Sequence, residues 1–156
     1  MTNKIIGIQG DKLDKINISS DTSIFLAHEA QKLGYKIFYY TPSNLSIIKN
    51  KTYANGVFVK LNYERKKFYK IYKKQKIDVE NLKFILIRQD PPFNSEYLIT
   101  TLILDDLKKT RVINNPVAIR NVSEKLYSKK FTKYMPDTIF SNNIEEVKKF
   151  YKQNKS

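Results

Sequence analysis

The stretch Ile85-Leu-Ile-Arg-Gln-Asp-Pro-Pro-Phe-Asn94 decides how the rest of the chain is organised. The apolar run over 84–87 predicts a buried strand, which delivers Arg88 and Asp90 onto a double-proline turn. Proline lacks an N–H and has a fixed φ, so the strand ends before the turn. Open α/β sheets place ligand sites at the carboxyl ends of their strands, which makes Arg88 and Asp90 candidate ligand contacts. The alternative is a loop in which these two residues pair at the surface.

Strands and helices alternate on both sides of this stretch. Residues 4–10, 35–41, 45–48, 53–61 and 111–116 have the apolar or alternating character of strands. Helices are expected over 22–33, with Asp21 or Ser20 as N-cap and Gly34 at the end, and over 96–109. In the second helix, Leu98, Leu102, Ile103 and Leu107 are expected to face the core. This order predicts an α/β fold with a mainly parallel sheet flanked by helices.

The densest basic segment covers residues 64–76. Phe68, Ile71 and Tyr72 stand at i, i+3 and i+4, which predicts an amphipathic helix with a solvated lysine face. The same mixture of basic and aromatic residues is compatible with a nucleic-acid interface. Lysine dominates the formal net charge of +14, whereas base readout favours arginine, so nucleic acid is not the expected partner.

Composition excludes several other classes of protein. The chain has 156 residues and no cysteine, and it has no apolar run of the roughly 18 residues that a membrane span requires. The first residues have no signal-peptide pattern, so a cytoplasmic location is expected.

Gly7 and Gly10 lack the spacing of a phosphate-binding loop and are interpreted as turn and packing glycines. The single histidine, His28, is interpreted as a packing or surface residue.

Several motifs in order resemble bacterial glutathione synthetases. Arg88-Gln-Asp-Pro-Pro-Phe is similar to a signature in their amino-terminal domain, and Asp11, Asn17, Asp21 and Ser23 match a pattern after the first strand. Asn114-Asn-Pro116 and the run from Arg120 through Glu-Lys-Leu126 are similar to the connection into the ATP-grasp domain. The resemblance implies a Rossmann-like amino-terminal domain over 1–122 and the first elements of an incomplete ATP-grasp domain over 123–156.

The resemblance also implies a reaction and binding residues. The family joins γ-glutamylcysteine to glycine with ATP and Mg²⁺ through an acyl phosphate. Arg88 and Asp90, with Asn17 and Ser23 as weaker candidates, would contact the substrate, and Lys125 would contact ATP. Arg120 is expected to be structural. No catalytic residue is assigned, because the glycine-rich loop and the magnesium ligands of the family are absent from this sequence.

The missing parts lead to two hypotheses. The first is the amino-terminal part of a glutathione synthetase, inactive alone: a truncated or split gene product, or a fragment of a longer chain. Its expected protein partners are a companion chain that carries the rest of the ATP-grasp domain, or further copies of itself in a homo-oligomer. The second is a non-catalytic α/β binding module that uses its basic surface for an anionic ligand, a nucleic acid or a partner protein. A strand over 135–141 and a helix over 144–153 are expected to fold back onto the sheet or to expose an apolar patch.

Overall fold

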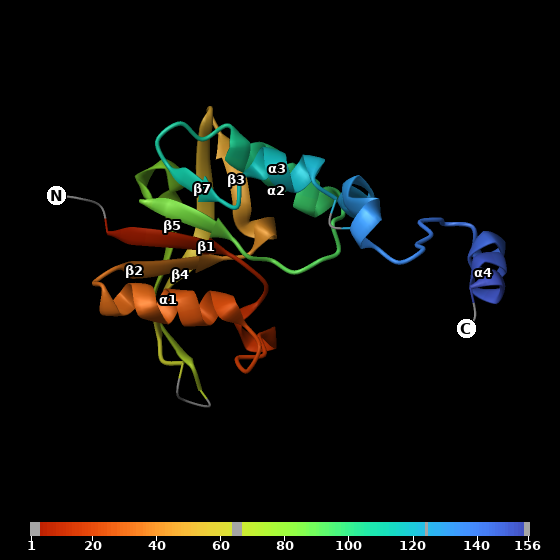
Figure 1. Ribbon diagram of the computed structural model, residues 1–156. Coiled ribbons are helices and arrows are strands. Elements are labelled where there is room, and N and C mark those ends of the chain that lie inside the picture. Colours follow the sequence, from red (N-terminus) through yellow and green to blue (C-terminus); the bar gives the residue numbers. More distant parts are fainter. Residues whose placement is uncertain (1–3, 64–66, 124, 155–156) are drawn as a thin grey trace. The chain divides into compact units, whose positions relative to one another are not determined.

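The computed structural model describes residues 4–63, 67–123 and 125–154, which form two compact units, Met1–Arg120 and Asn121–Ser156. Figure 1 shows the elements along the chain. Among the described residues, no helix has the length and apolar character needed to cross a membrane.

The first unit is built on one seven-stranded sheet. Its order is β3-β4-β2-β1-β6-β7, and β5 pairs with β4. The strands are β1 (Ile5–Gln9), β2 (Lys36–Tyr40), β3 (Leu45–Ile48), β4 (Lys51–Leu61), β5 (Tyr69–Asp78), β6 (Phe84–Ile87) and β7 (Arg111–Ile113). The pairs β1–β2, β1–β6 and β6–β7 are parallel, whereas β4 is antiparallel to β2, β3 and β5. The predicted α/β class with a parallel core is therefore confirmed.

Helices cover both faces of this sheet (Figure 1). On one face, α1 (Thr22–Lys32) buries Ile24 and Ala27 against Ile6, Ile8 and Ile37. On the other, α2 (Ser95–Asp105) buries Leu104 in a cluster with Ile85 and Ile87, and α3 (Pro116–Asn121) adds Ile119. The 3₁₀ turns of this unit are η1 (Leu13–Lys15), η2 (Pro42–Asn44) and η3 (Val79–Asn81). Gly34 ends α1 with φ 84°, as predicted.

The predicted helix over residues 64–76 is wrong. Residues 64–66 lie outside the described part of the chain, and the remainder leads into β5, which pairs with β4 from Leu61↔Tyr69 to Tyr53↔Asp78. Antiparallel pairing with β4 from Tyr53 to Leu61 outweighs the local helical spacing. Lysines on the exposed β5 edge discourage pairing with another chain.

The predicted buried face of α2 is also wrong in part. Leu98 and Leu102 are 38% and 52% exposed, whereas Thr100 and Thr101 face the core. The threonine hydroxyls donate to the helix carbonyls of Tyr97 and Leu98, at 2.9 and 2.7 Å. Because these bonds satisfy the hydroxyl donors inside the helix, both threonines can be buried.

Glu80 fastens the connection between α2 and β7. Its carboxylate accepts backbone N–H bonds from Lys108, Lys109 and Thr110 at 2.7, 2.8 and 2.9 Å. Burial acts to raise the pKa of Glu80, but these three donors and the nearby Lys109 charge outweigh it, so the pKa is lowered. This contact explains why α2 ends before Lys108 and Lys109, which were expected in its last turn.

The second unit contains η4 (Leu126–Tyr134) and α4 (Ile144–Gln153), and neither buries a residue. Asn143 caps α4 by accepting from the N–H of Glu145 at 3.0 Å, so this helix is confirmed at the predicted residues. Residues 135–141, all of them described, form no strand, contrary to the prediction. A strand needs a neighbour for its backbone groups, and no described segment pairs with this one.

Candidate functional site

The candidate site lies where three parallel strands end. Gln9, the last residue of β1, is opposite Tyr40 of β2 and Ile87 of β6. The N–H of Gly10 donates to the Tyr40 carbonyl at 3.1 Å, and the N–H of Arg88 donates to the Gln9 carbonyl at 2.7 Å. These bonds fix the chain just past the sheet edge, which is the position expected for a ligand site in an open α/β sheet.

Arg88 is oriented by the first turn of α1. Its Nε donates to Ser23 Oγ at 2.9 Å, and its Nη2 donates to Thr22 Oγ1 at 2.7 Å. Asp21 caps the same turn by accepting from the N–H of Ile24 at 2.8 Å. Ser23 is 4% exposed, so its hydroxyl serves to position Arg88. The structure therefore brings two of the predicted residues together across 65 positions of sequence.

Asp90 does not form the surface ion pair with Arg88 that the sequence left open. Instead, its backbone N–H donates to Asp11 Oδ2 at 2.9 Å. The Tyr39 hydroxyl donates to the Asp11 carbonyl at 2.7 Å. Asp11 thus links the ends of β1, β2 and β6, and the Asp90 residue that it fixes is exposed.

Asn17 shapes the loop between β1 and α1. Its Oδ1 accepts from the backbone N–H and the hydroxyl of Ser19 at 3.2 and 2.7 Å. Its carbonyl accepts from the N–H groups of Ser20 and Asp21 at 3.1 and 3.0 Å. These contacts hold the turn that leads into α1, and Asn17 also lines the cavity described below, so its contact with a substrate stays a prediction.

These loops enclose a cavity of about 600 Å³ that carries both signs of charge. Cations come from Lys12, Lys15 and Arg88, and carboxylates come from Asp11, Asp21 and Asp90. Two of the five guanidinium N–H groups of Arg88 bond to α1, and the rest are available to a carboxylate. Such a cavity suits a small molecule that has both anionic and cationic groups.

Two tyrosines beside the cavity have raised pKa values. For Tyr39, burial is the main cause, and the carboxylates of Asp21, Asp11 and Asp90 add to it. For Tyr97, burial raises the pKa, Arg88 opposes the rise, and Asp11 and Asp90 increase it. Both hydroxyls therefore stay protonated at neutral pH, and Tyr39 remains a hydrogen-bond donor to the Asp11 loop.

A polar cluster beneath the site was missed by sequence reasoning. Gln9 Nε2 donates to Gln89 Oε1 at 2.5 Å and to Thr100 Oγ1 at 3.5 Å, and all three residues are buried. The cluster ties β1 to α2 and holds Gln89 between the two candidate ligand residues. Glutamine in an apolar strand was the available signal, since a buried amide needs partners.

The remaining predicted residues lie elsewhere. Lys125 is exposed in the second unit, where its carbonyl accepts from Ser128 at the start of η4. Arg120 of α3 donates to Asp105 of α2 at 2.7 Å. The bond joins two helices, which is consistent with the structural role expected for Arg120. His28 faces Glu29 at 3.9 Å.

The described part of the chain contains no cluster of metal ligands. No three side chains of histidine, aspartate, glutamate or cysteine gather there into a group that would hold an ion. No chemical step is assigned to Mg²⁺ on these residues.

Fold and site together define an α/β domain with a cavity of mixed charge at the sheet edge, where open α/β sheets place their ligand sites. A sequence model described as "Prokaryotic glutathione synthetase, N-terminal domain" matches residues 5–120. The chain belongs to this family. The matched range coincides with the first compact unit, apart from its first four residues.

Curated relatives give the same result. The chain is 36% identical over 149 residues to the glutathione synthetase of Mesorhizobium japonicum, covering 95% of this chain and 48% of the relative. It is 35% identical over 150 residues to that of Buchnera aphidicola subsp. Acyrthosiphon pisum, with coverages of 95% and 47%. For Agrobacterium fabrum the identity is 33% over 148 residues, with coverages of 94% and 46%. The chain thus spans about half the length of the curated relatives it matches.

Proposed function

We propose that this chain supplies the amino-terminal, substrate-binding part of a glutathione synthetase. In this proposal, residues 1–122 form the substrate domain and residues 123–156 begin the ATP-grasp domain. The observation that carries the proposal is the fixed Arg88 guanidinium, which faces a cavity of mixed charge at the sheet edge. The family membership supplies the reaction, an ATP-dependent ligation of γ-glutamylcysteine and glycine in the cytoplasm.

γ-Glutamylcysteine fits the charges of the cavity. The molecule has two carboxylates and one ammonium group. Arg88 would bind a carboxylate through its remaining N–H groups, because guanidinium and carboxylate form paired hydrogen bonds. Asp90 would accept from the ammonium group, since its carboxylate is exposed while its backbone is fixed by Asp11. Ser23 and Asn17 would act indirectly, by holding Arg88 and the loop before α1.

ATP and magnesium belong to the other part of the proposed enzyme. ATP supplies the phosphoryl group that activates a carboxylate, and Mg²⁺ offsets phosphate charge. Lys125 is the one residue of this chain that we assign to ATP, through its ammonium charge. Its exposure leaves it accessible to a nucleotide. The remaining ATP and metal contacts would come from a polypeptide equivalent to the second half of the relatives.

A non-catalytic binding module is the second candidate. The observation in its favour is the exposed lysine series of β5, which includes Lys70, Lys73, Lys74 and Lys76. An anionic partner would be attracted by this edge. This candidate differs from the first in the site it uses, so variants of β5 and of Arg88 distinguish the two.

The test is calorimetric titration of the 156-residue chain with γ-glutamylcysteine, followed by ADP measurement with ATP, Mg²⁺ and glycine added. Saturable binding that Arg88→Ala weakens at least tenfold and that Lys73→Ala plus Lys74→Ala preserves would support the substrate domain. Absence of binding, or loss of binding only in the lysine variant, would reject it. ADP release by the chain alone would reject our assignment of the ATP and metal contacts to another part.

A further inference from the structure

We propose that the first unit has a second ligand site, which binds an oligophosphate group, the chain of linked phosphates that a nucleoside triphosphate carries. The site lies where β4 changes neighbours between β2 and β3, and three lysines line it. It shares only Lys12 and Tyr39 with the cavity beside Arg88. This site is separate from the one used in the proposed function, so either can exist without the other.

The sheet has a break beside β4. This strand pairs with β2 through residues 57–59 and with β3 through residues 51–54. Asn55 and Gly56 lie between these two ranges, so neither has a partner on that side among the described strands. A cavity of about 570 Å³ is found at this break, and its lining also includes residues of the connection after β2. The volume is within the range of about 300–1,000 Å³ that is typical of small-molecule sites.

The charged side chains that line this cavity are all cations. Lys12 follows β1, while Lys74 and Lys76 lie on β5, and no aspartate or glutamate of the described chain is part of the lining. Side chains two residues apart on a strand point to the same face, about 7 Å from each other. In the described structure neither Lys12 nor Lys74 forms an ion pair, and the Lys76 ammonium lies 5.1 Å from the centre of the Tyr53 ring. Three ammonium groups and no lining carboxylate favour an anion that carries several charges.

Lysine without arginine favours phosphate over carboxylate as the anionic group. Arginine pairs with a planar carboxylate through two parallel hydrogen bonds, whereas the lysine ammonium binds phosphate as a point charge. The spacing of Lys74 and Lys76 suits two phosphates of one chain. The amides of Asn55 and Gln75 also line the cavity and form no side-chain hydrogen bond with the described residues, so they are available to phosphate oxygens.

Part of the lining is apolar. Leu13 and Tyr39 are buried, and Val57 is partly buried. These side chains offer a surface to the molecule that carries the phosphates, as small-molecule sites usually do. A nucleoside would use this surface, whereas inorganic triphosphate would not. The shared chemistry is the oligophosphate, and the affinities of the two compounds distinguish the sources.

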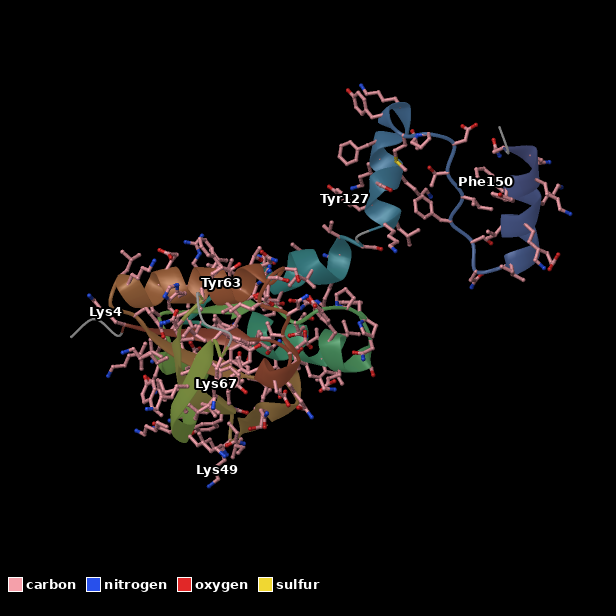
Figure 2. The ribbon with its side chains drawn as sticks, turned by 90° about the horizontal axis from the view of Figure 1, so that it is seen from below. Lys4, Lys49, Tyr63, Lys67, Tyr127 and Phe150 are labelled. Atoms are coloured by element: carbon pink, nitrogen blue, oxygen red, sulfur yellow. The ribbon has the colours of Figure 1, made fainter. Side chains whose placement is uncertain are left out.

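Several other lysines of the described first unit stand apart from one another or beside carboxylates. Figure 2 shows Lys4, Lys49 and Lys67 at separate points of its surface. Another cavity with lysines in its lining includes Asp78, and a further one includes Glu96. The cavity beside Arg88 likewise has both signs of charge. The recess and its uniform charge, rather than the number of lysines, therefore single out the cavity at β4.

The test titrates the 156-residue chain with sodium triphosphate and with ATP by calorimetry, without magnesium and in about 0.15 M salt, which screens exposed charges. We expect saturable 1:1 binding. Lys74→Ala plus Lys76→Ala should weaken it roughly tenfold or more, because two charged contacts are lost. Lys70→Ala plus Lys73→Ala is the matched control, since it removes the same charge from the same strand at residues outside the cavity. It should change the affinity by less than about twofold. Lys12 is left in place because it also lines the first cavity.

Equal affinity for triphosphate and ATP would support the site with the phosphates alone as ligand, and tighter binding of ATP would support it with a nucleoside on the apolar surface. Absence of saturable binding, equal weakening by the two lysine pairs, or adenosine that binds as tightly as ATP would overturn the proposal. Binding that is lost in Lys125→Ala but kept in Lys74→Ala plus Lys76→Ala would also overturn it, and would agree instead with the nucleotide contact assigned to Lys125.

Nuclear magnetic resonance locates the ligand without any substitution. The backbone amide signals of Asn55 and Gly56 should shift as triphosphate is added, because both residues line the cavity. The Arg88 amide should shift less, since Arg88 lines the other cavity. Shifts confined to Arg88 and its surroundings would place the anion in the first cavity and overturn the second site.

Discussion

Arg88 at the end of β6 and Ser23 in the first turn of α1 are joined by a hydrogen bond of 2.9 Å from Nε to Oγ. The bond connects a loop after the sheet to a helix that starts more than sixty residues earlier. Because Thr22 accepts from the same guanidinium, the arginine is held on one side by neutral hydroxyls and keeps its full charge for a ligand.

Arg88→Ala should weaken γ-glutamylcysteine binding roughly 10- to 100-fold, in line with about 1.5–3 kcal/mol for a hydrogen bond to a charged group. Arg88→Lys should recover only part of the affinity, because an ammonium group cannot form the paired contact. Calorimetric titration gives the dissociation constants. Equal affinity in the lysine variant and the unaltered chain would show that charge alone suffices.

Ser23→Ala should weaken the same binding by a smaller factor, about fivefold, since the charge stays while one orienting bond of about 1 kcal/mol is lost. Ser46→Ala on β3 is the control, because the Ser46 hydroxyl forms no side-chain hydrogen bond with the described residues. A loss of affinity as large as that caused by Arg88→Ala would instead indicate that Ser23 contacts the ligand itself.

Tyr39→Phe should lower the free energy of unfolding by about 1 kcal/mol through loss of the bond to the Asp11 carbonyl. Urea denaturation followed by circular dichroism measures the change. Tyr35→Phe serves as the comparison, because Tyr35 packs against Phe84 through its ring and should change stability by less than about 0.5 kcal/mol. Equal effects of the two substitutions would exclude a special role for the Tyr39 hydroxyl.

Gly10→Ala should destabilise the fold by about 1–3 kcal/mol, the usual cost of overpacking. A Cβ at Gly10 would collide with the Tyr39 hydroxyl and lie 2.9 Å from Cζ. The same substitution in a Tyr39→Phe background should cost less, because the hydroxyl is gone. If Gly10→Ala lowered the free energy of unfolding equally in both backgrounds, the clash with the Tyr39 hydroxyl would not be the cause of the destabilisation.

Glu80→Gln should destabilise the first unit by about 1–3 kcal/mol, since an amide replaces a charged acceptor of three N–H bonds. The folded-state pKa of Glu80 is lowered, so its stabilisation is present above the ordinary value of 4.5 and is lost as pH falls through the folded pKa. Urea midpoints measured from pH 7 to pH 3 give the pH dependence. The difference in urea midpoint between the unaltered chain and Glu80→Gln should shrink over the acidic part of this range. A midpoint difference that stays constant with pH would contradict a stabilising role for the Glu80 charge. Glu29→Gln, which removes a surface ion pair, should have little effect.

Local sequence patterns were sufficient to predict most helices and strands of the first unit. β6 has the predicted bounds, Gly34 adopts the expected positive φ, and Asp21 caps α1. These features depend on residues within a few positions of one another, so the sequence pattern contains the information. The motifs around Arg88 likewise led to the family through residues that are adjacent in the chain.

The structural predictions that were wrong share a different cause. The segment before and within β5 has helical spacing, but its conformation is decided by pairing with β4. Thr100 and Thr101 replace Leu98 and Leu102 on the buried face of α2 because the helix carbonyls satisfy their hydroxyls. Residues 138–141 have strand composition and no pairing partner among the described residues. Each outcome depends on neighbours that are distant in the chain or outside it.

The sequence by itself therefore determined the α/β class, the family and the candidate arginine, because short-range patterns and motifs carry that information. Only the tertiary structure decided that Arg88 bonds to Ser23 and Thr22, that Asp11 fixes Asp90, and that Gln9, Gln89 and Thr100 lie beneath them. The physical reason is that side-chain hydrogen bonds depend on distances of about 3 Å between segments, which the sheet register sets and no local pattern encodes.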